Sequence, residues 1–325
     1  MKICIYGAGA IGGYLAFALA EAGVDVSIVA RGGHLEAIRQ NGLRLRNGDQ
    51  DRTVKLIATD EPERLGPQHY VIITLKAHSV PAVAERVTTL FNEQTAVVTA
   101  VNGLPWWYFY RHGGPLENTR LESVDPNGVQ WRLFGPERAI GCVVYPAAEV
   151  EQPGVVRVID GDRFALGEPS GESSERMLGL ADALKAGGLK APVKSRIRDD
   201  IWIKLWGNLS FNPVSALTTA TLEEICRFSE TRAVIRAMMV EARAVGEAIG
   251  VRFAIDVDKR IAGGEAVGAH KTSMLQDLER GRPMEIDALV SVVQEIARKV
   301  DIPTPIIDAV LGLIKLRAIK AGAYP

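Results

Sequence analysis

Short apolar runs alternate with glycine turns and amphipathic stretches over the first third of the chain. Residues 2–6 and 24–30 are two such runs, and between them lie a glycine-rich turn at 7–12 and an apolar-periodic segment. This order predicts a strand, a tight turn, a helix and a second strand. Two further β-branched runs, 71–75 and 96–101, are apolar on both faces, as in a parallel sheet that helices cover on both sides. The pattern therefore predicts an α/β fold with an open, doubly wound sheet.

The hydrophobic pattern changes character near residue 196. Before this point, residues 140–145 and 155–159 predict two more strands, and residues 174–185 predict an amphipathic helix. Beyond it strand signals disappear, and prolines separate long helical patterns. We expect helices over 198–217, 221–249, 255–262, 284–300 and 304–320. The chain is thus predicted to contain two domains, an α/β domain over residues 1–196 and an all-helical domain over residues 197–325.

Residues 106–136 show neither helical nor strand periodicity. The segment begins with five aromatic residues, 106–110, and continues through glycine and proline turns. Long irregular stretches inside compact domains are often binding loops or lids. The alternative interpretation is an extra hairpin that packs its aromatic side chains on the edge of the sheet, and the sequence does not decide between the two.

The glycine turn is the clearest functional signal in the chain. Between a strand and a helix, GxGxxG is the dinucleotide-binding pattern of Rossmann-type folds. Gly7 permits the sharp turn, Gly9 lets the backbone approach a pyrophosphate, and Gly12 lets helix and strand pack closely. The helix N-terminus then offers unpaired N–H groups to the phosphates. We expect the cofactor to contact the whole loop, which consists of Gly7, Ala8, Gly9, Ala10, Ile11 and Gly12.

The residue that ends the second strand indicates which dinucleotide is bound. Sites for NAD usually carry Asp or Glu there, to bond the ribose hydroxyls. This chain carries Arg31, followed by two glycines and no acid. A guanidinium can hold a 2′-phosphate in a fork, whereas a carboxylate would repel it. We therefore predict NADPH/NADP+ as the cofactor, and a solvated surface arginine is the alternative. Lys76 and Asn102 follow two other predicted strands, whose carboxyl ends face the ligand in such sheets.

Composition narrows the remaining function classes. The 325 residues are 47% hydrophobic and carry a formal net charge of −1, so neither nucleic acid nor a membrane surface is expected as a partner. The cysteines and histidines lie outside any metal-ligand spacing, so no metal site is expected. No run reaches the roughly 18 apolar residues of a membrane span, and the chain opens directly with a strand rather than a leader. We expect a cytoplasmic protein.

The densest polar pattern lies in the first helix predicted for the second domain. Lys204, Asn208 and Asn212 are four residues apart, so they project from one stripe among large apolar residues. Because Asn is a poor helix former, the stripe favours an amide ladder lining a polar ligand over a solvated face. A second polar cluster runs from Ser273 to Glu285, and a helix that starts at residue 283 would explain Glu285 without any catalytic role.

With these motifs the sequence resembles the ketopantoate reductase (2-dehydropantoate 2-reductase) family over nearly its whole length. The matching motifs are the opening GAGAIGG, Thr-Leu-Lys-Ala at 74–77, Asn102-Gly103, the stripe from Lys204 to Asn212, and Ser273-Met274-Leu275-Gln276-Asp277 with Glu285. The resemblance implies NADPH-dependent reduction of 2-dehydropantoate to pantoate in pantothenate synthesis. It implies a catalytic lysine at Lys204 and a partnering acid at Glu285. The further implied contacts are substrate amides at Asn102, Asn208 and Asn212, a substrate-carboxylate contact at Ser273, and a cofactor-side lysine at Lys76.

Two departures from the family pattern leave other functions open. Val101 and Ser79 stand where the family often has glutamine, and the aromatic segment is longer than the usual connection. A paralogue that acts on a different 2-oxo or 3-hydroxy acid is therefore an alternative, as is a non-catalytic NADPH-binding sensor. The expected partners are a small 2-oxo acid and, in a possible homodimer, a second copy of the chain.

Overall fold

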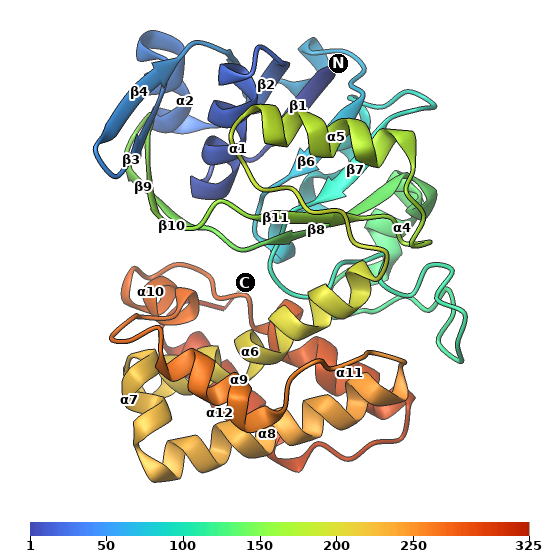
Figure 1. Cartoon of the computed structure of the whole chain (residues 1–325), viewed down its shortest axis with the longest axis vertical. Helices are drawn as coiled ribbons and strands as arrows, with labels where there is room; N and C mark the ends of the chain where they lie inside the picture. The colour runs from blue at the N-terminus through green and yellow to red at the C-terminus, as the bar shows by residue number, and fades with distance from the viewer. Residues whose placement is uncertain (325) are drawn as a thin grey trace. The chain divides into compact units, whose positions relative to one another are not determined.

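The structure is a computed structural model, and it describes residues 1–324. The chain folds into two compact units, whose elements are labelled in Figure 1. Unit 1 comprises Met1–Val101 and Gly128–Ile197. Unit 2 comprises Asn102–Asn127 and the described residues from Arg198 onward. Unit 1 is an α/β unit with a mostly parallel sheet, and helices make up the regular structure of unit 2, so the predicted fold class is confirmed.

The main sheet of unit 1 has seven strands in the order β11-β8-β7-β6-β1-β2-β5. All neighbouring strands are parallel except β11, which runs antiparallel to β8. Its strands are β1 (Lys2–Tyr6), β2 (Asp25–Val29), β5 (Ile57–Thr59), β6 (Tyr70–Ile73), β7 (Ala96–Thr99), β8 (Ala139–Val144) and β11 (Phe164–Gly167). The central strands are apolar and buried, as their β-branched sequences predict.

A second sheet of four strands, in the order β4-β3-β10-β9, was not predicted. It consists of β3 (Leu43–Asn47), β4 (Gln50–Val54), β9 (Ala147–Gln152) and β10 (Val155–Asp160). The parallel pairing of β3 with β10 joins Leu45 to Val156, and this long-range register has no local sequence signal. Helix α1 (Ala10–Glu21) contacts strands of both sheets. It approaches β10 so closely that a Cβ on Gly13 would lie 2.6 Å from the Val156 side chain.

All but the last of the other α-helices of unit 1 lie between strands in the sequence, and the last, α5, follows β11 and packs beside α1 (Figure 1). They are α2 (Gly32–Asn41), α3 (Ala84–Thr88), α4 (Val129–Phe134) and α5 (Glu175–Ala186). Ser174 caps α5 by accepting a hydrogen bond from the backbone of Met177, which places the start of this helix where the sequence predicts it.

Helices form the regular structure of unit 2. They are α6 (Ile197–Thr218), α7 (Leu222–Arg227), α8 (Ser229–Ala248), α9 (Val257–Glu265), α10 (Ser273–Glu279), a π-helical segment (Asp287–Ser291), α11 (Val292–Lys299) and α12 (Pro305–Lys320). The single helix predicted over 221–249 is wrong, because Phe228 adopts an extended backbone (φ −73°, ψ 119°) that separates α7 from α8. The helix predicted from residue 284 begins later, and its first turns are π-helical.

Residues 102–127 belong to unit 2, which differs from the predicted division into continuous domains 1–196 and 197–325. The reason is local packing. The Tyr108 ring contacts Trp202 of α6, and the Arg198 guanidinium donates to the backbone carbonyls of Tyr108 and Tyr110. The Glu295 carboxylate also accepts hydrogen bonds from the segment. Residues 106–109 are buried and contain no strand, so the predicted edge hairpin is wrong.

Arg198→Ala should lower the free energy of unfolding by about 3 kcal/mol, because it leaves two carbonyls of the aromatic segment without their charged donor. Urea unfolding measures this loss. Arg236→Ala is the matched control, since Arg236 pairs with Asp258 on the exposed surface, and it should cost less than about 1 kcal/mol. Equal losses in the two variants would show that Arg198 does not hold the segment.

Candidate active site

Three of the predicted site residues form one hydrogen-bonded chain within unit 2. The Lys204 ammonium donates to the Asn102 amide oxygen at 2.9 Å, and the Asn102 amide nitrogen donates to the Glu285 carboxylate at 3.3 Å. All three side chains are half-buried, so they can meet a ligand and yet are sheltered from bulk water. The amide oxygen bonds to a cation, and the amide nitrogen bonds to an anion. This arrangement holds a proton-bearing amine in a fixed orientation.

The backbone around Asn102 explains why that amide is held in place. Gly103 has a left-handed backbone (φ +86°), and a Cβ there would lie 2.3 Å from the Ala288 carbonyl oxygen. The next residue, Leu104, donates its N–H to the same carbonyl at 3.2 Å. Ala288 lies in the π-helical segment, and π-turns of this kind occur frequently at functional sites. The Asn102-Gly103 pair is thus docked against the segment that follows Glu285.

Helix α6 positions Lys204 through the apolar residues around it. Trp202, Leu205 and Trp206 are buried, and the Trp206 indole donates to the Met239 carbonyl at 2.8 Å. A Cβ on Gly246 of α8 would lie 2.5 Å from the Trp202 indole nitrogen, so the two helices pack very closely. This packing fixes the rotation of α6 and therefore the direction of its polar stripe.

The remaining predicted substrate residues lie near this chain in the sequence but are not hydrogen-bonded to it within residues 1–324. Asn208 is half-buried and Asn212 is 5% exposed, and both continue the Lys204 stripe of α6. Ser273 is exposed in the first turn of α10, where the neighbouring Thr272 caps the helix by accepting from the Leu275 N–H. The structure therefore groups the α6 stripe and leaves Ser273 on the surface of its own helix.

The glycine loop of unit 1 has the backbone geometry that its motif predicts. Gly7 has φ +121°, and a Cβ on Gly12 would lie 1.9 Å from the Gly7 carbonyl oxygen, so both positions require glycine. A Cβ on Gly9 would meet nothing within 4 Å. Gly9 is the N-cap of α1, and the first turn of this helix carries no acid. The open space at a helix N-terminus fits a pyrophosphate that approaches the backbone.

Arg31 and Lys76 follow strands that neighbour β1. Strand β2 ends two residues before Arg31, and β6 ends three residues before Lys76. Because β1 pairs in parallel with both strands, the carboxyl ends of all three lie at the same edge of the sheet. Arg31 is exposed at the N-cap of α2, and Lys76 is half-buried. The loop, the arginine and the lysine thus share one edge.

Sequence reasoning missed His34, which lies in the first turn of α2 close to Arg31 in the chain. Its Nδ1 accepts the Gly154 N–H at 3.0 Å. Burial lowers the pKa of this imidazole, and the nearby Ala8 backbone partly offsets the effect. The ring thereby bonds to the residue that precedes β10. A single histidine after two glycines gives no signal of this role in the sequence.

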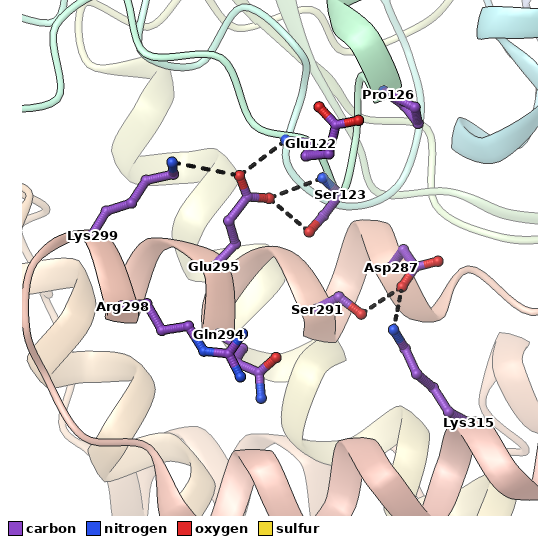
Figure 2. Close-up of a pocket in the computed structure, with 10 residues that line it drawn as sticks. All are labelled: Glu122, Ser123, Pro126, Asp287, Ser291, Gln294, Glu295, Arg298, Lys299 and Lys315. Carbon is purple, nitrogen blue, oxygen red and sulfur yellow. Dashed lines mark hydrogen bonds and ion pairs between the residues drawn. The ribbon is translucent and has the colours of Figure 1, made fainter.

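A cavity of about 610 Å³ in unit 2 lies among charged residues that were not predicted as site residues (Figure 2). Most of its charges are satisfied by one another. Glu295 accepts from the backbone and hydroxyl of Ser123, and the Asp287 carboxylate accepts from Ser291 and pairs with Lys315. Most of the charged side chains that line the cavity are therefore held by ion pairs and hydrogen bonds to neighbouring residues.

Within residues 1–324, no group of three or more His, Cys, Asp or Glu side chains is arranged to hold a metal ion. The three cysteines are buried and form no disulfide within residues 1–324, and burial raises the pKa of the Cys4 thiol to about 12. In the same residues, no helix combines the length and the apolar composition needed to cross a bilayer.

A GxGxxG loop in an α/β unit, together with a lysine bonded to an amide that also bonds a carboxylate in a helical unit, is typical of nicotinamide-dependent oxidoreductases. Two family models match the chain: "Ketopantoate reductase PanE/ApbA" over residues 3–171 and "Ketopantoate reductase PanE/ApbA C terminal" over residues 196–318. The chain therefore belongs to the ketopantoate reductase family and is an oxidoreductase.

Individual relatives agree with this assignment. A 2-dehydropantoate 2-reductase from Mesorhizobium japonicum is 59% identical over 325 residues, which are 100% of both chains. A crystal structure from Ralstonia solanacearum, of a protein provisionally named a ketopantoate reductase, is 42% identical with a TM-score of 0.95 and covers 99% of both chains. D-mandelate dehydrogenase, solved with NADH and anilino(oxo)acetate, shares the fold at 21% identity and a TM-score of 0.84, over 99% of this chain and 100% of that one.

Comparison of Gly9→Ala with Gly12→Ala should distinguish an effect on cofactor binding from an effect on folding. The methyl group of Gly9→Ala would enter open space on an ordinary backbone (φ −66°), so the melting temperature should hold while NADPH affinity falls at least about tenfold. Gly12→Ala should lower both, because its methyl group would collide with Gly7. Thermal unfolding and fluorescence titration measure the two effects. Unchanged NADPH affinity in Gly9→Ala would exclude the loop as the phosphate site.

Proposed function

We propose that this protein reduces 2-dehydropantoate (ketopantoate) to pantoate with NADPH, a step of pantothenate and coenzyme A synthesis. The observation that carries the proposal is the hydrogen-bonded chain of Lys204, Asn102 and Glu285 in a member of the ketopantoate reductase family. The 59% identity to the Mesorhizobium japonicum enzyme supports the same substrate. The three cysteines, which form no disulfide within residues 1–324, favour a reducing compartment, so we place the reaction in the cytoplasm.

Lys204 is the proposed proton donor. When bound, NADPH supplies the hydride that reaches the C2 carbonyl carbon of the 2-oxo acid. The Lys204 ammonium stabilises the negative charge that develops on the carbonyl oxygen and donates the proton that makes the hydroxyl group. The Asn102 oxygen accepts one ammonium hydrogen and so orients the remaining two. Glu285, at the other end of the amide, supplies a nearby negative charge that favours the charged form of lysine.

The other polar residues of the α6 stripe orient the substrate. Asn208 and Asn212 project from the same face as Lys204, and their amides can hold the hydroxyl and carboxylate oxygens of a small 2-oxo acid. Ser273 is the proposed contact for the substrate carboxylate. Holding the carbonyl in one orientation is itself a large part of the rate enhancement in such reactions.

Unit 1 is the proposed cofactor-binding part. Residues 7–12 would hold the pyrophosphate at the N-terminus of α1, Arg31 would hold the 2′-phosphate, and Lys76 would contact the cofactor farther along. Asn102, which belongs to unit 2, is a further proposed cofactor contact. A non-catalytic NADPH sensor would have little use for a lysine that an amide and a carboxylate orient, so the hydrogen-bonded chain favours an enzyme.

Lys204→Ala should reduce kcat at least about a hundredfold while leaving NADPH affinity unchanged, because it removes the proton donor and nothing from unit 1. The measurement is NADPH oxidation with ketopantoate, and a panel of other 2-oxo acids tests the choice of substrate. Lys259→Ala, an exposed lysine paired with Asp256, is the matched control and should keep normal activity. Normal turnover in Lys204→Ala would eliminate the proposed acid, and faster turnover of another 2-oxo acid by the unaltered enzyme would replace ketopantoate.

Arg31→Ala should weaken NADPH binding at least about tenfold and leave NADH binding nearly unchanged, because NADH has no 2′-phosphate. Equilibrium titration with both dinucleotides gives the comparison within one variant. Arg39→Ala, which removes an exposed arginine of the same helix that pairs with Asp60, should change neither affinity. Equal losses for the two dinucleotides in Arg31→Ala would contradict the 2′-phosphate contact.

A further inference from the structure

Glu285 lies on an irregular segment, residues 280–285, between α10 and the π-helical segment. Such a segment lacks the regular backbone hydrogen bonds that fix a side chain on a helix or strand. Its bond from Asn102 is also long, at 3.3 Å. The direction of the Glu285 carboxylate therefore depends on how its neighbours in the chain are held.

The last described residues of the chain hold the residue before Glu285. The Met284 N–H donates to the Ala323 carbonyl at 2.8 Å, and both residues are fully buried. The Ala323 N–H in turn donates to the Ala318 carbonyl of α12 at 2.8 Å. Gly322, with φ +64°, lets the chain reverse after the helix. The backbone on one side of Glu285 is thus bonded to the end of α12.

The residue two positions after Glu285 is held by the same tail. The Tyr324 hydroxyl donates to one oxygen of the Asp287 carboxylate at 2.8 Å. The other oxygen accepts from the Ser291 hydroxyl at 2.5 Å and from the Lys315 ammonium at 3.0 Å, and Figure 2 shows these two side chains converging on it. Burial raises the pKa of Asp287, but the three hydrogen bonds outweigh this effect and hold the pKa below its usual value. At neutral pH the Asp287 carboxylate is therefore ionised, and both of its oxygens accept hydrogen bonds.

We infer that Tyr324 is a positioning residue for the reaction, because its hydroxyl holds Asp287 and so fixes the segment that carries Glu285. This inference rests on the proposed function, in which Glu285 orients Lys204 through Asn102. Met284 and Asp287 flank Glu285 closely, and the tail at 323–324 bonds to both, so the tail limits the movement of the carboxylate between them. Tyr324 acts indirectly, through Asp287, and needs no contact with substrate.

The inference accounts for the unusual number of donors at Asp287. A surface acid is normally solvated, whereas this carboxylate accepts hydrogen bonds from the π-helical segment, from α12 and from the tail. The Lys315 ammonium also lies 5.6 Å from the centre of the Tyr324 ring, so the ring and the hydroxyl are both held in place. Removing the hydroxyl alone would release the acid from the tail and leave the ring packed.

The test is Tyr324→Phe, which keeps the ring and removes one donor. We expect kcat with ketopantoate to fall about tenfold, while the dissociation constant for NADPH and the melting temperature stay near those of the unaltered enzyme. Amide hydrogen exchange should become faster in a peptide covering residues 280–287 and stay unchanged in peptides of unit 1. Tyr145→Phe, which removes the hydroxyl of an exposed tyrosine in unit 1, is the matched control and should change none of these quantities.

Asp287→Asn provides a second, independent variant. It should reproduce the loss of kcat, and the double variant Tyr324→Phe/Asp287→Asn should be no slower than the slower single variant, because the Tyr324 hydroxyl acts only through Asp287. Additive losses in the double variant would overturn the inference, as would unaltered kcat and unaltered exchange in Tyr324→Phe. A fall in kcat that accompanies lost NADPH binding and a lowered melting temperature would also overturn it, by showing a general structural role.

The exchange measurement separates this inference from the proposed function. If the unaltered enzyme does not reduce any 2-oxo acid, the proposed function fails, and faster exchange at 280–287 in Tyr324→Phe still shows that the tail holds the segment. If the enzyme is active and exchange does not change, the positioning role fails while the proposed function stands.

Discussion

The arrangement in unit 2 depends on the ability of one side-chain amide to bond to a cation and an anion at once. The oxygen of Asn102 accepts from Lys204, and its nitrogen donates to Glu285. A carboxylate at residue 102 would repel Glu285, and an apolar side chain would leave both charges without this partner. The amide must also be aimed, which is why the next residue is a glycine in contact with Ala288. The position of the Asn102 amide thus depends on the backbone of its own segment, at Gly103, and on the backbone of the π-helical segment, at Ala288.

The two units shape their candidate sites in opposite ways. In unit 1 the glycine loop works by lacking side chains: Gly12 leaves room for Gly7, and Gly9 leaves room for a ligand. In unit 2 large side chains do the positioning, as the buried indoles of Trp202 and Trp206 fix the rotation of α6. Gly7 and Gly12 leave no room for a side chain, whereas the indoles of unit 2 act by filling volume.

The local sequence pattern was sufficient to predict those features that depend on residues close together in the chain. The strand–glycine–helix order gave the α/β class, and the spacing of four residues gave the stripe that contains Lys204. The second sheet was missed because β3 pairs with a strand more than a hundred residues away. The break at Phe228 was missed because the sequence there has no glycine or proline to signal it. The tie between Asp287 and Tyr324 is equally non-local, since two ordinary residues acquire a role only where the fold brings them together.

Unit 2 is assembled from two pieces of chain, because Asn102–Asn127 lies in the middle of the sequence of unit 1. The helical half from Arg198 onward contains Lys204 and Glu285 but not the amide that joins them. If only this half were replaced by that of a distant relative, the Asn102 amide of one protein would have to bond the lysine and the glutamate of another. A hybrid that kept the native hydrogen-bonded chain would therefore have to take residues 102–127 together with the helical half.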